Sequence, residues 1–266
     1  MKTVLTIAGS DCSGGAGIQA DIKTILANGA YAMSVITAMT AQNTLGVMAV
    51  QASTPEFLAQ QLDAVFTDIH PDAVKIGMVF SSDLAHVIGE KLRRYNAKNV
   101  VLDPVMVASS GAKLLQTQAV DTLKKELFPL ARIITPNLPE AEALLSQGIP
   151  DKTAMEAAAK QLSDTFGCAV LLKGGHRSSD ADDVLYEQGT FYWFHGEHIS
   201  TNNTHGTGCT LSSAIAVGLA DGCDMPTAVQ RAKDYVLGAL KANLHLGHGC
   251  GSIDHGWKIK KNLSNS

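Results

Sequence analysis

The sequence predicts an α/β fold in which a mainly parallel central sheet carries helices on both faces. Short apolar runs alternate with stretches of helical periodicity along the whole chain, which is typical of repeated strand–helix units and hence of parallel strands. Hydrophobic residues make up 45% of the chain, enough for a substantial core, and neither a low-complexity linker nor an internal repeat divides the sequence. We therefore expect one domain of doubly wound type over residues 1–266.

The first half of the chain shows this alternation through β-branched apolar runs and amphipathic stretches. Isoleucine and leucine recur at helical spacing after the first strand. A further helix should begin at Thr54, because threonine is a good N-cap and Pro55 suits the first helical position. We expect strands at 3–8, 31–40, 73–77 and 99–104, and helices at 17–29, after 54 and at 82–94.

The second half continues the pattern and adds one antiparallel hairpin. Residues 183–196 alternate around Gln188-Gly189, which predicts two strands joined by a tight turn. Thr153 and Glu156 have the spacing of a capping box and should open a helix. We expect strands at 131–137 and 169–175, and helices at 117–127, 138–146, 153–167, 207–221 and 225–243.

Composition excludes several classes of protein. The net charge is −4, so no basic face is predicted and we expect no nucleic-acid partner. No run of 18 apolar residues occurs, and the N-terminal apolar stretch is soon interrupted by Asp11, so we expect neither a membrane span nor a secretory signal. Five scattered cysteines without C-x-x-C spacing argue against a disulfide framework or a zinc cage and favour a reducing cytoplasm.

The stretch NNTHGTGC, which ends at Cys209, is the first candidate site. Gly206 and Gly208 bracket Thr207 where a helix should begin. A helix N-terminus exposes unpaired N–H groups with partial positive charge, and glycine lets the backbone approach an anion such as phosphate. A glycine-rich turn without a ligand is the alternative. The Cys209 thiol would either have its pKa lowered by the helix terminus or serve as a small packing residue.

The loop GSDCSGGAGIQAD at 9–21 is also glycine-rich and lies between a strand and a helix. It fits the dinucleotide fingerprint only weakly and contains no G-K-[ST], so neither a nicotinamide cofactor nor a Walker loop is expected. Asp11 and Asp21 bring hydrogen-bond acceptors to this region. They would contact a substrate or merely cap the turn and the helix.

Three further polar residues follow expected strand ends, where ligands bind in open α/β sheets. Asn137 and Glu140 supply oxygen atoms that suit a hydrated Mg²⁺, although ordinary helix capping would explain the same pair. Lys173 ends a buried strand and would either reach a phosphate or extend its charged end to solvent. Taken together, these sites favour phosphoryl transfer, which depends on positioning and charge neutralisation.

The motifs of this chain occur in a known order. The chain resembles the hydroxymethylpyrimidine/phosphomethylpyrimidine kinases of thiamine biosynthesis, within the ribokinase superfamily, over nearly its whole length. Gln42 strengthens the resemblance, because related pyridoxal-phosphorylating members usually lack that glutamine. The shared motifs are TIAGSDCSGGAGIQAD, TAQNT, DPVMVA, ITPNLPEAEAL, LLKGGH and NTHGTGCTLSSAIA.

The resemblance implies a ribokinase-like three-layer α/β/α sandwich and an ATP- and Mg²⁺-dependent kinase. Such an enzyme would phosphorylate 4-amino-5-hydroxymethyl-2-methylpyrimidine and then convert the monophosphate to the diphosphate. Gln42 would bind the pyrimidine through its amide, which offers a donor and an acceptor. The remaining implied residues are Gly9, Ala16, Asp21, Met78 and Val105 around the pyrimidine, Gly206, Thr207, Gly208 and Cys209 at the transferred phosphoryl group, Lys173, Asn137 and Thr204 at ATP, and Asn137 and Glu140 at magnesium.

Cys209 stands where sugar-kinase relatives place an aspartate base. A thiolate could accept the hydroxymethyl proton, but the second phosphorylation attacks with a phosphate oxygen that needs no deprotonation. We therefore hypothesise that Cys209 assists the first step more than the second. One departure from the resemblance is Ser109, where many members carry lysine, and the glycine-rich tail 246–255 has no role that the sequence explains.

Two other functions are compatible with parts of the sequence. A pyridoxal or pyridoxine kinase of the same fold is the nearest alternative, and Gln42 argues against it. A non-catalytic protein that binds the pyrimidine is the other, and the combined phosphate and metal residues argue against it. The resemblance also implies a homodimer, for which the apolar edge near 31–50 is a candidate surface.

Overall fold

The computed structural model describes residues 1–106, 117–175 and 181–264 and contains a nine-stranded sheet. Six neighbouring strands, in the order β2-β1-β4-β5-β6-β7, are parallel, and antiparallel pairs extend both edges with β3 on one side and β8 and β9 on the other. The strands are β1 Thr3–Asp11, β2 Tyr31–Asn43, β3 Gly46–Ala52, β4 Ala73–Ile76, β5 Val100–Leu102, β6 Ile133–Ile134, β7 Ala169–Leu172, β8 Asp183–Glu187 and β9 Thr190–Phe194.

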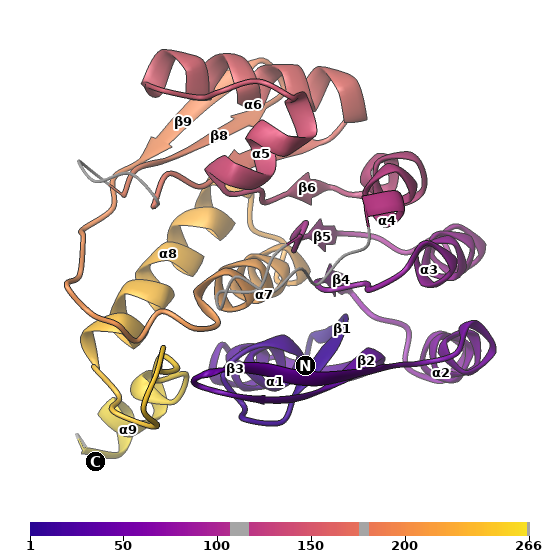
Figure 1. The fold of residues 1–266 in the computed structure, drawn as a ribbon, viewed down its shortest axis with the longest axis horizontal. Coiled ribbons are helices and arrows are strands. Elements are labelled where there is room, and N and C mark those ends of the chain that lie inside the picture. Colours follow the sequence, from indigo (N-terminus) through magenta and orange to yellow (C-terminus); the bar gives the residue numbers. More distant parts are fainter. Residues whose placement is uncertain (107–116, 176–180, 265–266) are drawn as a thin grey trace.

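Helices cover both faces of the sheet, so the fold has three layers (Figure 1). One face packs on α2 Pro55–Asp68, α3 Ser82–Arg94, the short α4 Thr117–Thr122 with the turns Leu123–Leu127 and Phe128–Leu130, α5 Leu138–Leu145 and α6 Lys152–Phe166. The other packs on α1 Gly17–Ala27, α7 Thr207–Ala220 and α8 Met225–Lys241, with α9 Trp257–Ser264 beyond them.

Alternate residues of each central strand belong to two separate cores. Leu5, Ile7 and Ile76 join the core beneath α2, α3 and α6, whereas Val4 and Val101 join the core beneath α7 and α8. A strand buried on both faces is apolar at most positions, which is why these segments are mainly apolar runs in the sequence, with Thr6 and Lys75 as buried polar exceptions. The predicted α/β fold class is confirmed.

The structure corrects several local predictions. Helix α6 is capped by Asp151, whose carboxylate accepts from the Ala154 N–H at 2.8 Å, and not by the Thr153 capping box. Strand β3 and helix α9 were not expected. Every residue of β3 is at least partly exposed, so it carries no alternating pattern by which a strand is recognised.

The site-forming residues lie beyond the carboxyl ends of the parallel strands. Strand β1 continues to Asp11 and β2 to Asn43, past a register shift after Ala8, so the two carry polar side chains clear of the central sheet. Within the described residues, no helix is both long enough and apolar enough to cross a bilayer.

Candidate active site

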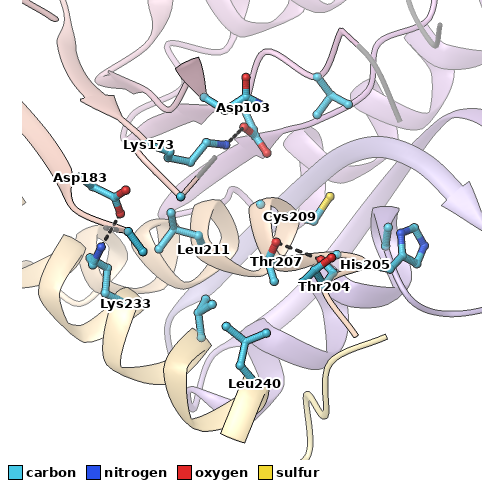
Figure 2. Close-up of a pocket in the computed structure, with 18 of the residues that line it drawn as sticks. Asp103, Lys173, Asp183, Thr204, His205, Thr207, Cys209, Leu211, Lys233 and Leu240 are labelled. Carbon is cyan, nitrogen blue, oxygen red and sulfur yellow. Dashed lines mark hydrogen bonds and ion pairs between the residues drawn. The ribbon is translucent and has the colours of Figure 1, made fainter. Parts of the chain in front are cut away.

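A cavity of about 880 Å³ opens at the carboxyl ends of the strands, where an open α/β sheet binds its ligands. The glycine loop after β1 and the end of β2 form one end of this cavity, and α8 lines the other. The entrance of α7 lies between them (Figure 2). The volume of this cavity falls in the range of small-molecule sites, so two ligands can lie end to end within it.

The entrance of α7 is built as the sequence predicts for an anion site. Gly206 is the N-cap residue, with φ of 87°, and a Cβ there would overlap the carbonyl oxygen of Gly15. Only glycine therefore fits this position. Among the described residues no side chain caps this helix end, and its first turn carries no acidic residue. The N–H groups of Gly208 and Cys209 lie in that first turn, which has no intrahelical acceptors to offer them.

A part-buried ion pair lies beside this helix entrance. Lys173 Nζ donates to Asp103 Oδ1 at 2.9 Å, and Asp103 also accepts from the Thr135 hydroxyl at 3.1 Å. Figure 2 shows the lysine and the carboxylate meeting above α7, and a Cβ placed on Gly208 would lie 3.3 Å from Asp103 Oδ2 and 3.5 Å from Lys173 Nζ. Although burial opposes it, Asp103 raises the pKa of Lys173, so the ammonium stays charged at the cavity wall.

Asn137 and Glu140 form a capping box at the start of α5. Asn137 Oδ1 accepts from the Glu140 N–H at 2.9 Å, and Glu140 Oε2 accepts from the Asn137 N–H at 2.8 Å. The capping interpretation therefore holds for both residues. Both also line the cavity, and burial raises the pKa of Glu140 to about 7 against the opposing effect of Lys173.

These residues fit a particular kind of magnesium site. No group of three His, Cys, Asp or Glu in the described part of the chain could enclose a metal. Mg²⁺ in phosphoryl-transfer sites keeps several waters and is held by one or two carboxylates together with substrate phosphates. Glu140, buried near Lys173 and Asp103, is a carboxyl group whose ionisation a cation would favour. A hydrated ion bound mainly by phosphates is compatible with this donor set.

Cys209 lines the cavity one residue after Gly208. Burial raises the pKa of its thiol, with Lys75 opposing and Asp21 and Asp103 reinforcing the effect. Of the two alternatives for Cys209, a thiol with a lowered pKa and a small packing residue, the direction of this pKa shift favours the second. At neutral pH the resting side chain is a neutral thiol.

Asp21 is the one predicted pocket residue that does not line the cavity. Its side chain is completely buried beneath α7 and forms an ion pair with the equally buried Lys75, at 2.8 Å. It also accepts from the hydroxyls of Thr6 at 2.6 Å and Ser213 at 2.7 Å. The structure thus corrects its assignment from a substrate contact to a link between α1, β4 and α7.

Gln42 lies at the other end of the cavity, beside His205 and Asp11. His205 Nε2 is 2.9 Å from Asp11 Oδ2 and 3.2 Å from the Gln42 carboxamide. Asp11 also accepts from the N–H groups of Gly15 and Ala16 at 3.1 and 2.9 Å, which folds the glycine loop around the carboxylate. These contacts, led in strength by those from His205 and Ser13, overcome burial and lower the pKa of Asp11 to about 2.

The glycine-rich tail encloses the turn that follows Gln42. The Thr44 hydroxyl accepts from the N–H groups of His248 and Gly249, each at 3.1 Å, and the Thr44 carbonyl accepts from Cys250 at 3.0 Å. A Cβ on Gly249 would overlap that carbonyl oxygen. The tail, which the sequence alone did not explain, therefore fixes the β2–β3 turn.

Val236, Leu237 and Leu240 of α8 form an apolar wall of the cavity, beside the polar Gln230, Lys233 and Asp234 of the same helix. Leu211 of α7 and Leu240 of α8 face the cavity in Figure 2, where Lys233 pairs with Asp183. Asp183 also accepts from the Gly174 N–H at 2.9 Å and thereby connects α8 to the turn after Lys173.

All other predicted site residues that the structure describes line this one cavity, whereas Ser109 lies outside the described residues. Sequence reasoning missed Asp103, His205 and the Lys233–Asp183 pair as site residues. Asp103 lies near the end of the predicted strand 99–104 and directly follows β5, so its position at a strand end was the available signal. The lining set predicted from sequence is Gly9, Ala16, Gln42, Met78, Val105, Asn137, Glu140, Lys173, Thr204, Gly206, Thr207, Gly208 and Cys209.

Comparison with known proteins identifies the family of this chain. The family model for phosphomethylpyrimidine kinase matches residues 11–254. A hydroxymethylpyrimidine/phosphomethylpyrimidine kinase of Rhizobium meliloti is 48% identical over 94% of this chain and 96% of its own length. The thiamine biosynthesis bifunctional protein ThiED of Geobacter sulfurreducens is 49% identical over 95% of this chain, which spans only 52% of that relative.

Solved structures place the fold in the same group. The crystal structure of a phosphomethylpyrimidine kinase from Clostridium difficile 630 is 46% identical, with a TM-score of 0.81 over 89% of this chain and 98% of the other. A Bacillus subtilis pyridoxal kinase solved as an ADP complex is 35% identical, with a TM-score of 0.89 over 96% and 98%. The three-layer fold is therefore ribokinase-like, and the chain belongs to the phosphomethylpyrimidine kinase family.

Proposed function

We propose that this protein is an ATP-dependent kinase that phosphorylates 4-amino-5-hydroxymethyl-2-methylpyrimidine and then converts the monophosphate to the diphosphate, in thiamine biosynthesis. One observation carries the proposal. The N-terminus of α7, which begins at the N-cap residue Gly206, lies beside the charged Lys173. Both line a single cavity that has Gln42 at one end and an apolar wall at the other. The names of relatives at 43–49% identity support the same activity.

In this proposal the pyrimidine occupies the end of the cavity near Gln42. The carboxamide offers one donor and one acceptor to the exocyclic amine and its neighbouring ring nitrogen. Met78 and Val105 supply apolar contacts, while Gly9 and Ala16 allow the ring to approach the backbone. A Cβ on Gly9 would overlap the Met78 methyl group, so glycine keeps that wall in place.

The phosphoryl group is transferred at the entrance of α7. The N–H groups of Gly208 and Cys209, with the dipole of α7, stabilise negative charge on the migrating group. Gly206 and Thr207 shape this turn, and the Thr207 hydroxyl donates to the Thr204 carbonyl at 3.0 Å. Lys173 neutralises the nucleotide phosphates, because Asp103 holds its ammonium at the cavity wall. Magnesium, when bound, further neutralises phosphate charge, and Asn137 and Glu140 are the residues that would hold its waters.

Cys209 accepts the hydroxymethyl proton in the first step. It does so as the thiolate, because a neutral thiol already holds its proton and cannot take a second one. Burial raises the pKa of this thiol, so the resting side chain must first lose its own proton to water before it can accept that of the alcohol. The second step needs no such transfer, since the attacking phosphate oxygen is already ionised.

The apolar wall takes the adenine ring. Leu211 and Leu240 line the cavity and offer apolar contact area to the ring. Burial of the adenine ring against this apolar wall is favourable even without hydrogen bonds to its edge.

Further aspects of the proposal concern the assembly and its location. We infer one domain over residues 1–266, and a homodimer formed through the β2–β3 edge, where Met39, Leu45 and Met48 are 49%, 70% and 69% exposed. Exposed large apolar side chains on an edge strand favour association. All five cysteines are free thiols, which supports a reducing cytoplasm.

The test is a coupled assay of ATP consumption with the pyrimidine alcohol, its monophosphate and pyridoxal. We expect turnover of both pyrimidines and weak or no turnover of pyridoxal. Pyridoxal is included because solved pyridoxal kinases reach TM-scores of 0.87–0.89. Gln42→Met keeps the side-chain length but removes the amide pair, and should lower kcat/KM for the alcohol by roughly 10–100-fold while leaving KM for ATP unchanged. A preference for pyridoxal would contradict the proposal.

A further inference from the structure

Two neighbouring residues, His205 and Thr40, determine the orientation of the Gln42 carboxamide, that is, on which side its oxygen and its nitrogen lie. Its nitrogen, as placed, lies 3.2 Å from His205 Nε2, and its oxygen lies 3.1 Å from Thr40 Oγ1. A rotation of the carboxamide by 180° exchanges oxygen and nitrogen with almost no change in shape. The hydrogen-bonding roles of His205 and Thr40 therefore decide which orientation is stable.

His205 must be a donor at Nε2. That nitrogen is 2.9 Å from Asp11 Oδ2, and an ionised carboxylate can only accept. Asp11 also accepts from two loop N–H groups and from Ser13, so it is held as a carboxylate. His205 Nε2 has one hydrogen and, in this tautomer, no free lone pair, so an amide NH₂ placed opposite finds no acceptor there. The Gln42 oxygen can instead share that hydrogen with Asp11 in a bifurcated hydrogen bond. The His205 side therefore favours the oxygen of Gln42.

Thr40 gives the same answer independently. Its hydroxyl has one hydrogen and two groups within reach, the Ser10 carbonyl oxygen at 3.0 Å and the Gln42 carboxamide at 3.1 Å. The carbonyl can only accept, whereas the carboxamide can present either end, so we assign the hydrogen to Ser10. Thr40 Oγ1 can then only accept from Gln42. The Thr40 side therefore requires the NH₂ group, and the two neighbours agree on one orientation.

We propose that His205 and Thr40 are specificity-determining positioning residues that fix the polarity of the Gln42 carboxamide, with its oxygen toward His205 and its NH₂ toward Thr40. The inference rests on the proposed function and adds to it how the site distinguishes substituents on the pyrimidine ring. Thr40 and His205 are 8% and 7% exposed, so water cannot readily replace either contact. One amide hydrogen and one oxygen lone pair then remain for the substrate.

A fixed polarity makes the site selective for an amino group over an oxo group. A 4-aminopyrimidine presents an N–H donor next to a ring-nitrogen acceptor, whereas the 4-oxo analogue presents the reverse order. With the carboxamide held, the analogue sets donor against donor and acceptor against acceptor, and buried unpaired groups are costly. If the carboxamide could turn freely, the site would accept both analogues.

The test compares kcat/KM for the 4-amino alcohol and its 4-oxo analogue in wild type, Thr40→Val and Thr40→Ser. Valine keeps the shape but removes the hydroxyl, whereas serine keeps the hydroxyl. We expect Thr40→Val to lower the amino-to-oxo ratio about fivefold and Thr40→Ser to keep it within about twofold of wild type, since one hydrogen bond contributes about 1 kcal/mol. Calorimetric affinities for the two alcohols should show the same pattern, and KM for ATP should not change.

The outcomes separate this inference from the proposed function. If wild type turns over the amino alcohol and Thr40→Val keeps the wild-type ratio, the inference fails and the proposed function stands. Equal loss of the ratio in Thr40→Val and Thr40→Ser would assign the effect to packing and likewise overturn the inference. Failure of wild type to phosphorylate the amino alcohol would overturn the proposed function, and the inference with it. His205→Gln, which can still place a donor near Asp11, should keep more of the ratio than His205→Leu.

Discussion

Substituting Gly249 by alanine should weaken pyrimidine binding without touching the pyrimidine. A Cβ on Gly249 would overlap the Thr44 carbonyl oxygen, and both partners of that clash are backbone or fixed to it. The tail must therefore withdraw from the β2–β3 turn. Gln42 lies two residues before Thr44, so release of this turn loosens the residue that should bind the ring.

The magnitude follows from the contacts that are lost. Three hydrogen bonds join the tail to Thr44, from the N–H groups of His248, Gly249 and Cys250. They are exposed, so each contributes about 0.5–1 kcal/mol, and together about 1.5–3 kcal/mol. If that free energy must be supplied again when substrate binds, KM for the pyrimidine rises roughly 10–100-fold, because 1.4 kcal/mol corresponds to a factor of ten.

Steady-state kinetics with the pyrimidine alcohol and with ATP as varied substrates would measure this effect. The matched control is Gly148→Ala, since Gly148 lies in an exposed loop where an added Cβ meets nothing within 4 Å. We expect Gly249→Ala to raise KM for the alcohol while KM for ATP stays close to that of the control. A wild-type KM for the alcohol in Gly249→Ala would refute the view that the tail positions Gln42.

Three further predictions concern other parts of the molecule. Cys209→Ala should slow the first phosphorylation by about 10²-fold and the second by less than tenfold, and equal losses in the two measured rates would reject the division of labour. Lys75→Met leaves the carboxylate of Asp21 buried and unpaired, so urea denaturation should show a loss of about 3–5 kcal/mol, partly recovered by adding Asp21→Asn. Burial lowers the pKa of His255 from 6.5 to about 4, so its neutral ring contributes stability that is complete above pH 6.5 and lost as pH falls to 4. At 1.36 kcal/mol per pKa unit this amounts to about 3 kcal/mol, and thermal unfolding of His255→Gln over the same pH range should show a correspondingly weaker dependence.

Some wrong predictions arose where two local signals compete. Asp151 and Thr153 are both suitable N-caps two residues apart, and only the observed bond from Ala154 shows that the helix begins at the earlier one. Lys75 gave a signal that could have been used. A lysine in the middle of a buried strand needs a buried partner, and Asp21 is an acidic residue on the apolar face of α1.

The sequence by itself determined the alternation of strands and helices, the strand ends at which polar residues gather, and the glycine-opened entrance of α7. Each depends on residues within a few positions of one another, through periodicity, capping and the conformational freedom of Gly206. Only the tertiary structure decided that Lys173 meets Asp103 across 70 positions and that His205 meets Asp11 across 194. Such contacts follow from strand order and the packing of α7 against the sheet, which no local pattern encodes.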